Sequence, residues 1–342
     1  MATNKKKVLD GHQVSIKSDS ADQARLRLLQ ALWRERMDLP IGRQERPERD
    51  PVPLGSRVDD DEIRRQGINF LTPTVIERVE QTLAAADCAG VAQTGRLVSE
   101  QRLWSDLLSS QPLAFNLFGE LAADLTLATA AARRLWGDQI ASVTSICFEW
   151  SPGRGDSTYL DNHSSFDVFI AYTTATGTRG FVGIDVKYHE NMRARAAKAV
   201  DWYEENPRYA AVAEASESFS PQALKAVADP AMRGARSSLG GTPMQQLWFD
   251  HLLALSMTQA DDEWDHGKFV FMYPTANQRA RNAADDYRHV LNDGSGFEPM
   301  TIEKFVAATA ECTDAPWVEA FRQRYLDVGP VDALLGDADL KP

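Results

Sequence analysis

The chain has 342 residues, of which 43% are hydrophobic and 25% charged, and its net charge is −12. These proportions are typical of a globular protein with a full core, and no apolar run reaches the roughly 18 residues of a membrane span. The lysines near the start are not followed by an apolar stretch, so we expect no secretory signal there. Three scattered cysteines, Cys88, Cys147 and Cys312, argue against a disulfide framework or zinc ribbon. We therefore expect a soluble cytoplasmic protein.

The acidic net charge weakens a nucleic-acid hypothesis, because proteins that grip nucleic acid usually present a basic surface. Basic residues are nevertheless concentrated in a few segments, such as "RLRLLQALWRER", "MRARAAK" and "NQRARNAADDYRH". Net charge reports on solubility and steering rather than on one site, so a nucleic-acid partner stays open.

The first part of the chain predicts helices separated by polar connections. Residues 1–20 are polar and expected to be mobile. Residues 20–37 have helical apolar spacing with Ser20 as the cap, and 38–56 are rich in proline and charge, which indicates a loop or linker. Further helices are expected at 72–90, where Thr72 precedes a first-turn proline, and at 99–110.

The central part combines helices with apolar strands. A long helix is expected at 112–136, followed by strands at 142–150, 165–172 and 182–188. The remaining elements, in chain order, are a helix at 191–205, a helix at 242–259, a buried strand at 267–274, and helices at 277–291, 301–311 and 317–326. This order predicts an α/β fold with a mixed sheet of four or more strands flanked by helices, and with helical additions at both ends.

The same pattern predicts the division of the chain. Residues 1–55 form an arm with a linker, and 56–111 form a helical part packed on the core. Residues 112–342 form the α/β core, with a helical insertion at 190–245 and helices at the carboxyl end.

Two aspartates lie inside the second and third strands. Asp167 falls between apolar neighbours in "SFDVFIAY", and Asp185 does so in "VGIDVKY". Strand interiors disfavour aspartate, and a buried unpaired carboxylate is costly. If the strands pair as a hairpin, both carboxylates and Lys187 can converge on one face. Lys187 supplies one positive charge, and a hard divalent cation such as Mg²⁺, for which Mn²⁺ can substitute, would supply the rest.

Such a site can hydrolyse a phosphodiester. A metal ion can polarise the phosphate and lower the pKa of a bound water, while Lys187 would orient or help deprotonate the attacking water and offset transition-state charge. A structural ion pair between Asp185 and Lys187 is the alternative interpretation.

The combination of Asp167 with "DVK" at 185–187 resembles the PD-(D/E)xK nuclease superfamily, which has a restriction-endonuclease-like core of the order α-β-β-β-α-β. The stretches "SSQPLAFNLFGEL", "SSFDVFIAY" and "GIDVKYHEN" are similar to a bacterial subgroup described as restriction endonucleases. The resemblance covers roughly residues 105 to 275. It implies metal ligation by Asp167, Asp185 and the backbone carbonyl of Val186, with Lys187 as the catalytic lysine. It also implies a glutamate from the first helix, for which Glu120 is the candidate.

The sequence leaves two interpretations open for each of several other charged residues. Glu149 is an outer metal ligand or an exposed residue of an edge strand, and Glu190 reaches a second metal or caps the next helix. Arg154 in a glycine-rich loop contacts the nucleic-acid backbone or simply belongs to a flexible connection. Arg195 and Lys198 face phosphate or form a solvated helix face.

The sequence therefore predicts a Mg²⁺-dependent nuclease that cuts DNA, with restriction or other defence against foreign DNA as the role implied by the resemblance. The alternatives are a nucleic-acid-binding module without turnover and a metal-free structural protein. A homodimer is expected if both strands of a duplex are cut together. No membrane partner is expected.

Overall fold

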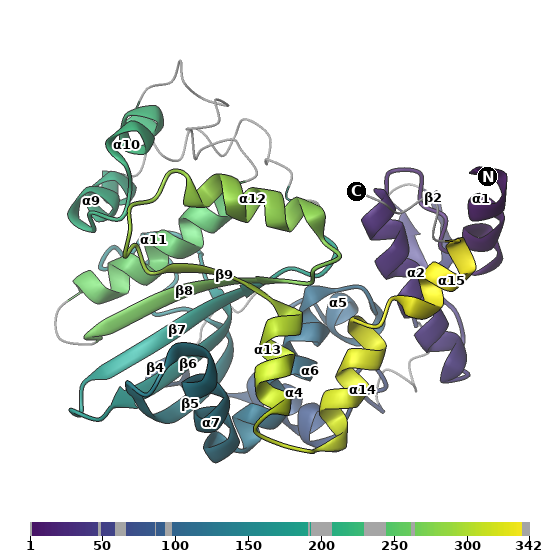
Figure 1. Ribbon diagram of the computed structural model, residues 1–342, viewed down its shortest axis with the longest axis horizontal. Coiled ribbons are helices and arrows are strands. Elements are labelled where there is room, and N and C mark those ends of the chain that lie inside the picture. Colours follow the sequence, from purple (N-terminus) through teal and green to yellow (C-terminus); the bar gives the residue numbers. More distant parts are fainter. Residues whose placement is uncertain are drawn as a thin grey trace.

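The computed structural model describes residues 2–46, 49–58, 66–85, 87–92, 98–190, 192, 207–228, 244–260 and 264–336. A five-stranded sheet with the strand order β5-β6-β7-β8-β9 lies at its centre (Figure 1). The strands are β5 (Ile140–Trp150), β6 (Phe166–Thr174), β7 (Arg179–Val186), β8 (His266–Tyr273) and β9 (Phe297–Thr301). The first three are antiparallel, and β7, β8 and β9 are parallel, so the sheet is mixed. The predicted α/β class is confirmed.

Strands β6 and β7 form the predicted hairpin. Their register runs from Val168 opposite Ile184 to Thr173 opposite Arg179. The turn is closed by a hydrogen bond in which the Thr174 backbone N–H donates to the Thr178 carbonyl. This hairpin carries both aspartates that the sequence singles out.

Helices cover both faces of the sheet, because alternate residues of each strand point to opposite sides. In β6, Val168 and Ile170 belong to one core, and Phe169 and Ala171 belong to the other. The first core is completed by α4 (Pro73–Ala84), α5 (Glu100–Ser105), α6 (Ser110–Ala123), α7 (Leu125–Trp136), α13 (Ile302–Ala310) and α14 (Pro316–Tyr325). The second is completed by α9 (Pro207–Ala215), α10 (Pro221–Ala228), α11 (Gln245–Gln259) and α12 (Gln278–Arg288). None of the described helices has the length and apolarity that crossing a membrane requires.

The two ends of the chain meet beside this core. Helix α2 (Ala21–Arg36) packs against α14 and α15 (Gly329–Leu335), and α1 (Ala2–Gly11) also packs against α15 (Figure 1). The predicted cap of α2 is confirmed, because the Ser20 side chain accepts a hydrogen bond from the Gln23 backbone N–H.

Several local predictions differ from the structure. Part of the segment 1–20, expected to be mobile, forms α1, and the helix expected at 72–90 ends at Ala84. The region 38–56, expected to be a loop, forms a hairpin of β1 (Gly42–Arg46) and β2 (Arg49–Leu54), and its prolines are tolerated because a two-stranded ribbon has only edge strands. The helix expected at 112–136 is two helices, because the Asp124 side chain accepts from two backbone N–H groups and starts α7. Strand β9 was not predicted. The helix expected at 191–205 lies outside the described residues, apart from residue 192.

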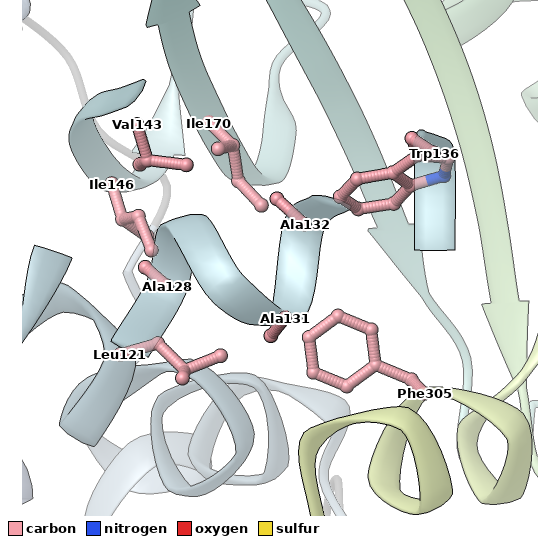
Figure 2. Close-up of a pocket in the computed structure, with 9 residues that line it drawn as sticks. All are labelled: Leu121, Ala128, Ala131, Ala132, Trp136, Val143, Ile146, Ile170 and Phe305. Atoms are coloured by element: carbon pink, nitrogen blue, oxygen red, sulfur yellow. The ribbon is translucent and has the colours of Figure 1, made fainter. Parts of the chain in front are cut away.

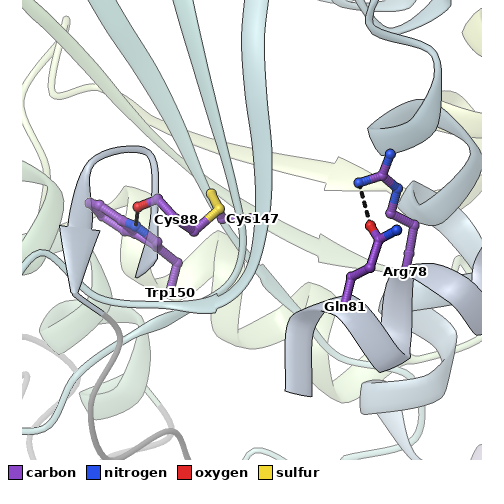
Figure 3. The surroundings of a disulfide bond; sticks show 5 residues. All are labelled: Arg78, Gln81, Cys88, Cys147 and Trp150. Carbon is purple, nitrogen blue, oxygen red and sulfur yellow. Dashed lines mark hydrogen bonds between the residues drawn. A yellow bond between two sulfur atoms is a disulfide. The ribbon is translucent and has the colours of Figure 1, made fainter. Parts of the chain in front are cut away.

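A disulfide joins Cys88 to Cys147, which corrects the expectation drawn from the scattered cysteines. Cys88 lies in a short hairpin of β3 (Asp87–Cys88) and β4 (Val91–Ala92) that folds back onto β5. The Trp150 indole N–H donates to the Cys88 carbonyl at 3.0 Å beside the disulfide (Figure 3). The two cysteines are 59 residues apart, so their spacing in the sequence gave no sign of this contact.

A small cavity lies between α7, the sheet and α13 (Figure 2). Its lining residues are Leu121, Ala128, Ala131, Ala132, Trp136, Val143, Ile146, Ile170 and Phe305. All of these side chains are apolar except for the indole nitrogen of Trp136, so the cavity offers almost nothing that would orient a polar ligand. We interpret it as a packing gap in the first core.

Candidate active site

Three carboxylates lie level with one another on three neighbouring strands. The register of β5 and β6 puts Glu149 opposite Asp167, and the register of β6 and β7 brings Asp167 level with Asp185. Adjacent strands are about 4.8 Å apart, so these acidic residues form a row across the sheet.

Asp185 and Lys187 form a buried ion pair at the end of β7. They are two residues apart and therefore point to the same side, and Lys187 Nζ lies 2.5 Å from Asp185 Oδ1. Burial alone would lower the pKa of Lys187, but the negative charges of Asp185 and Asp167 raise it above its ordinary value. Lys187 is therefore positively charged at neutral pH. The second oxygen of Asp185, Oδ2, is buried and has no hydrogen-bond partner among the described residues.

Asp167 lies where β6 and β7 begin to separate. Its Oδ2 accepts a hydrogen bond from the Val186 backbone N–H at 2.7 Å. Burial and the negative charge of Asp185 raise the pKa of Asp167 well above its ordinary value, although Lys187 acts in the opposite direction. Two carboxylates with one lysine are therefore incompletely neutralised, and an additional cation would stabilise both in their ionised form.

Glu149 adds a third buried acid from β5. Its exposed fraction is 8%, so the interpretation as an exposed residue of an edge strand is wrong. Its φ of 49° is rare for a glutamate within a strand. Burial raises the pKa of Glu149, whereas a hydrogen bond from Gln111 Nε2 to Oε1 at 2.9 Å opposes that shift.

Gln111 is a member of this cluster that the sequence reasoning missed. It lies in the first turn of α6, whose residues are buried almost throughout. Its backbone N–H donates to the Ser109 side chain, which caps the helix. The detectable signal was a glutamine at the start of an otherwise apolar helix, where a buried amide needs a partner.

Glu120, the glutamate that the resemblance suggested, is not brought to the acidic row. It lies at the other end of α6, nine residues after Gln111 and therefore about 13 Å along the helix axis. Its Oε1 accepts a hydrogen bond from the Thr72 hydroxyl at 2.5 Å. Thr72 is the cap of α4, so this contact joins α6 to α4 on the first core.

Glu190 closes the segment after Lys187. Its Oε2 accepts hydrogen bonds from the backbone N–H groups of Tyr188 and His189, at 2.6 and 3.0 Å. Burial would raise the pKa of Glu190, but the charges of His189 and Lys187 outweigh it and lower the pKa below its ordinary value. One of its oxygens is therefore committed to the backbone, and not free for a second metal.

Of the basic residues proposed for DNA contact, the structure describes Arg154 only. Arg154 Nη2 donates to the Glu149 carbonyl at 3.0 Å, so this arginine lies next to the Glu149 end of the acidic row. Arg195 and Lys198 lie outside the described residues.

The oxygen donors present fit a small divalent cation. Within the described residues, no three or more His, Cys, Asp and Glu side chains form a group that could hold a metal. A metal would therefore use two carboxylates, Asp167 and Asp185, with the Val186 carbonyl and water completing its coordination. Mg²⁺ commonly keeps several waters and takes one or two carboxylates. Asp185 Oδ2, to which no residue that the structure describes donates a hydrogen bond, provides the donor atom that such an ion needs.

Comparison with known proteins supplies the family. A family model for the PD-(D/E)XK nuclease superfamily matches residues 17–327, which is most of the chain. The chain therefore belongs to the PD-(D/E)XK nuclease superfamily, as the sequence resemblance predicts. The match also includes α2 and α14, well beyond the range of the resemblance. No match was found among curated proteins or among solved structures.

Proposed function

We propose that this member of the superfamily is a deoxyribonuclease that requires a divalent cation, Mg²⁺ or Mn²⁺. Asp167, Asp185 and the Val186 backbone carbonyl would hold the ion. The observation that carries the proposal is the buried Asp185 Oδ2, which has no hydrogen-bond partner in the described part of the chain and lies next to Asp167, a carboxyl group whose pKa is raised by burial and by Asp185. Carboxylates that only fill a structural role are expected to have partners for both oxygens.

The charges of the cluster support a cation requirement. Among the described residues, Asp167, Asp185 and Glu190 act electrostatically on Lys187, and Glu149 is acted on by Lys187, Arg102 and Arg154. Asp167 and Asp185 therefore share Lys187 as the cation beside them. A phosphodiester brought to this acidic group would be repelled unless a further positive charge were present. When bound, a divalent ion would polarise the phosphate and lower the pKa of a coordinated water.

The protein side chains have separate tasks in this proposal. Asp185 holds the Lys187 side chain in place, and Lys187 presents its positive charge to the phosphate of the bond that is cut. Because its pKa is raised by the neighbouring carboxylates, it acts as a charge and hydrogen-bond donor rather than as the base that deprotonates water. The Val186 N–H donates to Asp167 Oδ2 and thereby fixes the orientation of the whole carboxylate, so the direction of Oδ1 is set as well.

The substrate and the biological role follow from the family and from the resemblance. The superfamily implies a nucleic-acid substrate, and we propose DNA and a role in restriction or another defence against foreign DNA. Survival of cells challenged with bacteriophage, with the parental protein or with Asp185→Asn, tests the defence role. Equal numbers of plaques in both strains would refute that role without bearing on cleavage.

Cleavage itself is tested with supercoiled plasmid and purified protein. We expect nicking or linearisation with Mg²⁺ or Mn²⁺ and none with EDTA. Lys187→Met is expected to lower the rate about 100- to 1,000-fold, because it removes a charge that acts on the transition state.

Glu298→Gln is the matched control. Glu298 forms another lysine–carboxylate pair on the same sheet, with Lys268 at 2.9 Å, but belongs to β9. Its removal should leave the cleavage rate within about twofold. Cleavage that persists in EDTA, or a Lys187→Met variant as fast as the parent, would contradict the proposal. DNA binding without any cleavage would favour the alternative of a binding module.

A further inference from the structure

The segment directly after Lys187 is held by side chains from distant parts of the chain. Residues 188–190 belong to no strand. Their carbonyl groups nevertheless all accept hydrogen bonds. Asn277 Nδ2 donates to the carbonyls of Tyr188 and Glu190, at 3.2 Å each, and Gln23 Nε2 donates to the carbonyl of His189 at 3.0 Å. The orientation of this segment is therefore set by the elements around it.

The Tyr188 side chain is fixed in the same way. Its hydroxyl accepts from Gln30 Nε2 at 3.0 Å and donates to the Tyr325 carbonyl at 3.0 Å. Gln30 Nε2 also donates to the Arg324 carbonyl at 2.9 Å, and the Gln30 side chain is fully buried. Tyr188 is thus connected to α2 and α14 at once.

Gln23 and Gln30 come from one face of α2. They are seven residues apart, which is two helical turns, and both point to the residues that follow Lys187. A helix that only needed to pack could fill these positions with leucine or methionine at no polar cost. Two glutamines that reach the backbone and side chain of the same short segment instead define its direction, because hydrogen bonds constrain geometry in a way that apolar contacts do not.

We propose that Gln23 and Gln30 are positioning residues for Lys187, and that α2 is thereby a working part of the active site. The Gln23 amide bonds the His189 carbonyl, and the Gln30 amide bonds the Tyr188 hydroxyl. Because Tyr188 directly follows Lys187, these bonds also fix the backbone position from which the Lys187 side chain reaches Asp185. The inference rests on the proposed nuclease function for its kinetic part, but not for its structural part.

The test compares Gln30→Met with the parental protein and with Gln259→Met. Gln259 also donates a side-chain hydrogen bond to a backbone carbonyl, that of Val212, but this bond joins α11 to α9 instead of holding residues 187–190. In Gln30→Met we expect kcat for plasmid cleavage to fall about tenfold with KM within twofold, as for a lost supporting contact. Gln259→Met should change neither constant. Both are measured well below the melting temperature of each variant.

A second measurement does not depend on cleavage. Amide hydrogen exchange is followed in a peptide that covers residues 187–190, where the Lys187 N–H donates to the Met272 carbonyl and the Tyr188 and His189 N–H groups donate to Glu190. Exchange of this peptide should accelerate at least fivefold in Gln30→Met and stay unchanged in Gln259→Met. If Gln30→Met does not fold, Tyr188→Phe, which removes only the hydroxyl, replaces it in both measurements.

The outcomes separate the two proposals. Unchanged exchange at residues 187–190 in Gln30→Met would overturn the positioning role, whatever the enzyme does. Faster exchange with an unchanged kcat would also overturn it, because the segment would then be loosened without any effect on Lys187. A parental protein that cleaves no DNA would refute the proposed function, and the exchange measurement alone would then decide whether α2 orders the segment.

Discussion

Two buried cations, Lys187 and Arg324, differ in how completely their surroundings satisfy them. Arg324 is fully buried and donates to neutral acceptors, the Asn69 carbonyl, the Asn69 side chain and Gln30 Oε1. Its guanidinium also lies over the rings of Trp33 and Tyr325, at 3.8 and 4.7 Å. Burial lowers the pKa of Arg324 from its ordinary value, although Tyr325 opposes this.

Lys187, by contrast, lies beside more negative charge than it can neutralise, and one oxygen of its partner Asp185 receives no hydrogen bond from the residues described by the structure. The arginine network is complete within the protein, whereas the lysine network needs something from outside. This difference separates a structural cluster from a functional one, since a ligand can bind where hydrogen-bonding groups are unsatisfied and charge is unbalanced.

The largest effect on stability should come from removing the guanidinium of Arg324, whose hydrogen bonds are satisfied within the protein. Arg324→Met is expected to lower the free energy of unfolding by about 3 kcal/mol or more, because it leaves the buried side-chain oxygens Asn69 Oδ1 and Gln30 Oε1 without the donor that the arginine supplies. Chemical denaturation measures this. Arg322→Met on the same helix is the control, since Arg322 is mostly exposed and forms an exposed ion pair with Glu319. Equal losses in both variants would remove the distinction between the two networks.

A second complete network should be sensitive to acid. Neutral His251 is bonded at both ring nitrogens, to the Tyr287 hydroxyl and the Ser295 carbonyl. Burial lowers the pKa of His251 to about 4 from 6.5, although the Ser295 bond opposes this. Between these values the unfolded chain binds a proton that the folded protein does not, so the free energy of unfolding falls with falling pH, by up to about 3 kcal/mol at pH 4.

The measurement is denaturation at a series of pH values between 4 and 7. His251→Gln should flatten the pH dependence in this range, because the group that takes up the proton on unfolding is gone. An identical slope in variant and parent would show that other groups cause the loss.

The smallest change in stability is expected in the network of Lys187, Asp185 and Asp167, where a substitution should raise the free energy of unfolding. Asp167→Asn removes a carboxylate that Asp185 repels, while the Asn carbonyl can still accept from the Val186 N–H. We expect a gain of about 1 kcal/mol in the free energy of unfolding, together with loss of cleavage. Thermal unfolding and plasmid cleavage are measured on the same preparation. A loss of stability would mean that this carboxylate is structurally satisfied after all.

The sequence predicted the parts of this molecule that depend on local pattern. Period-two apolar strands, the hairpin and the aspartates within it were recognisable, because alternation and turn residues report directly on pairing. The contacts of Gln111, Gln30 and Cys88 were not, since each depends on residues far away in the sequence. Glu120 was chosen by analogy with a helix motif, and the structure instead brings the opposite end of that helix to the acidic row.

The β6–β7 hairpin also affects how the site assembles during folding. Asp167 and Asp185 are brought together by closing one short turn, so their approach costs little chain entropy and can occur early. The bond between Gln30 and Arg324 spans 294 residues and requires the two ends of the chain to meet. We therefore expect the two aspartates to approach each other first, and Lys187 to take its final orientation only when the long-range contacts of Gln30 form.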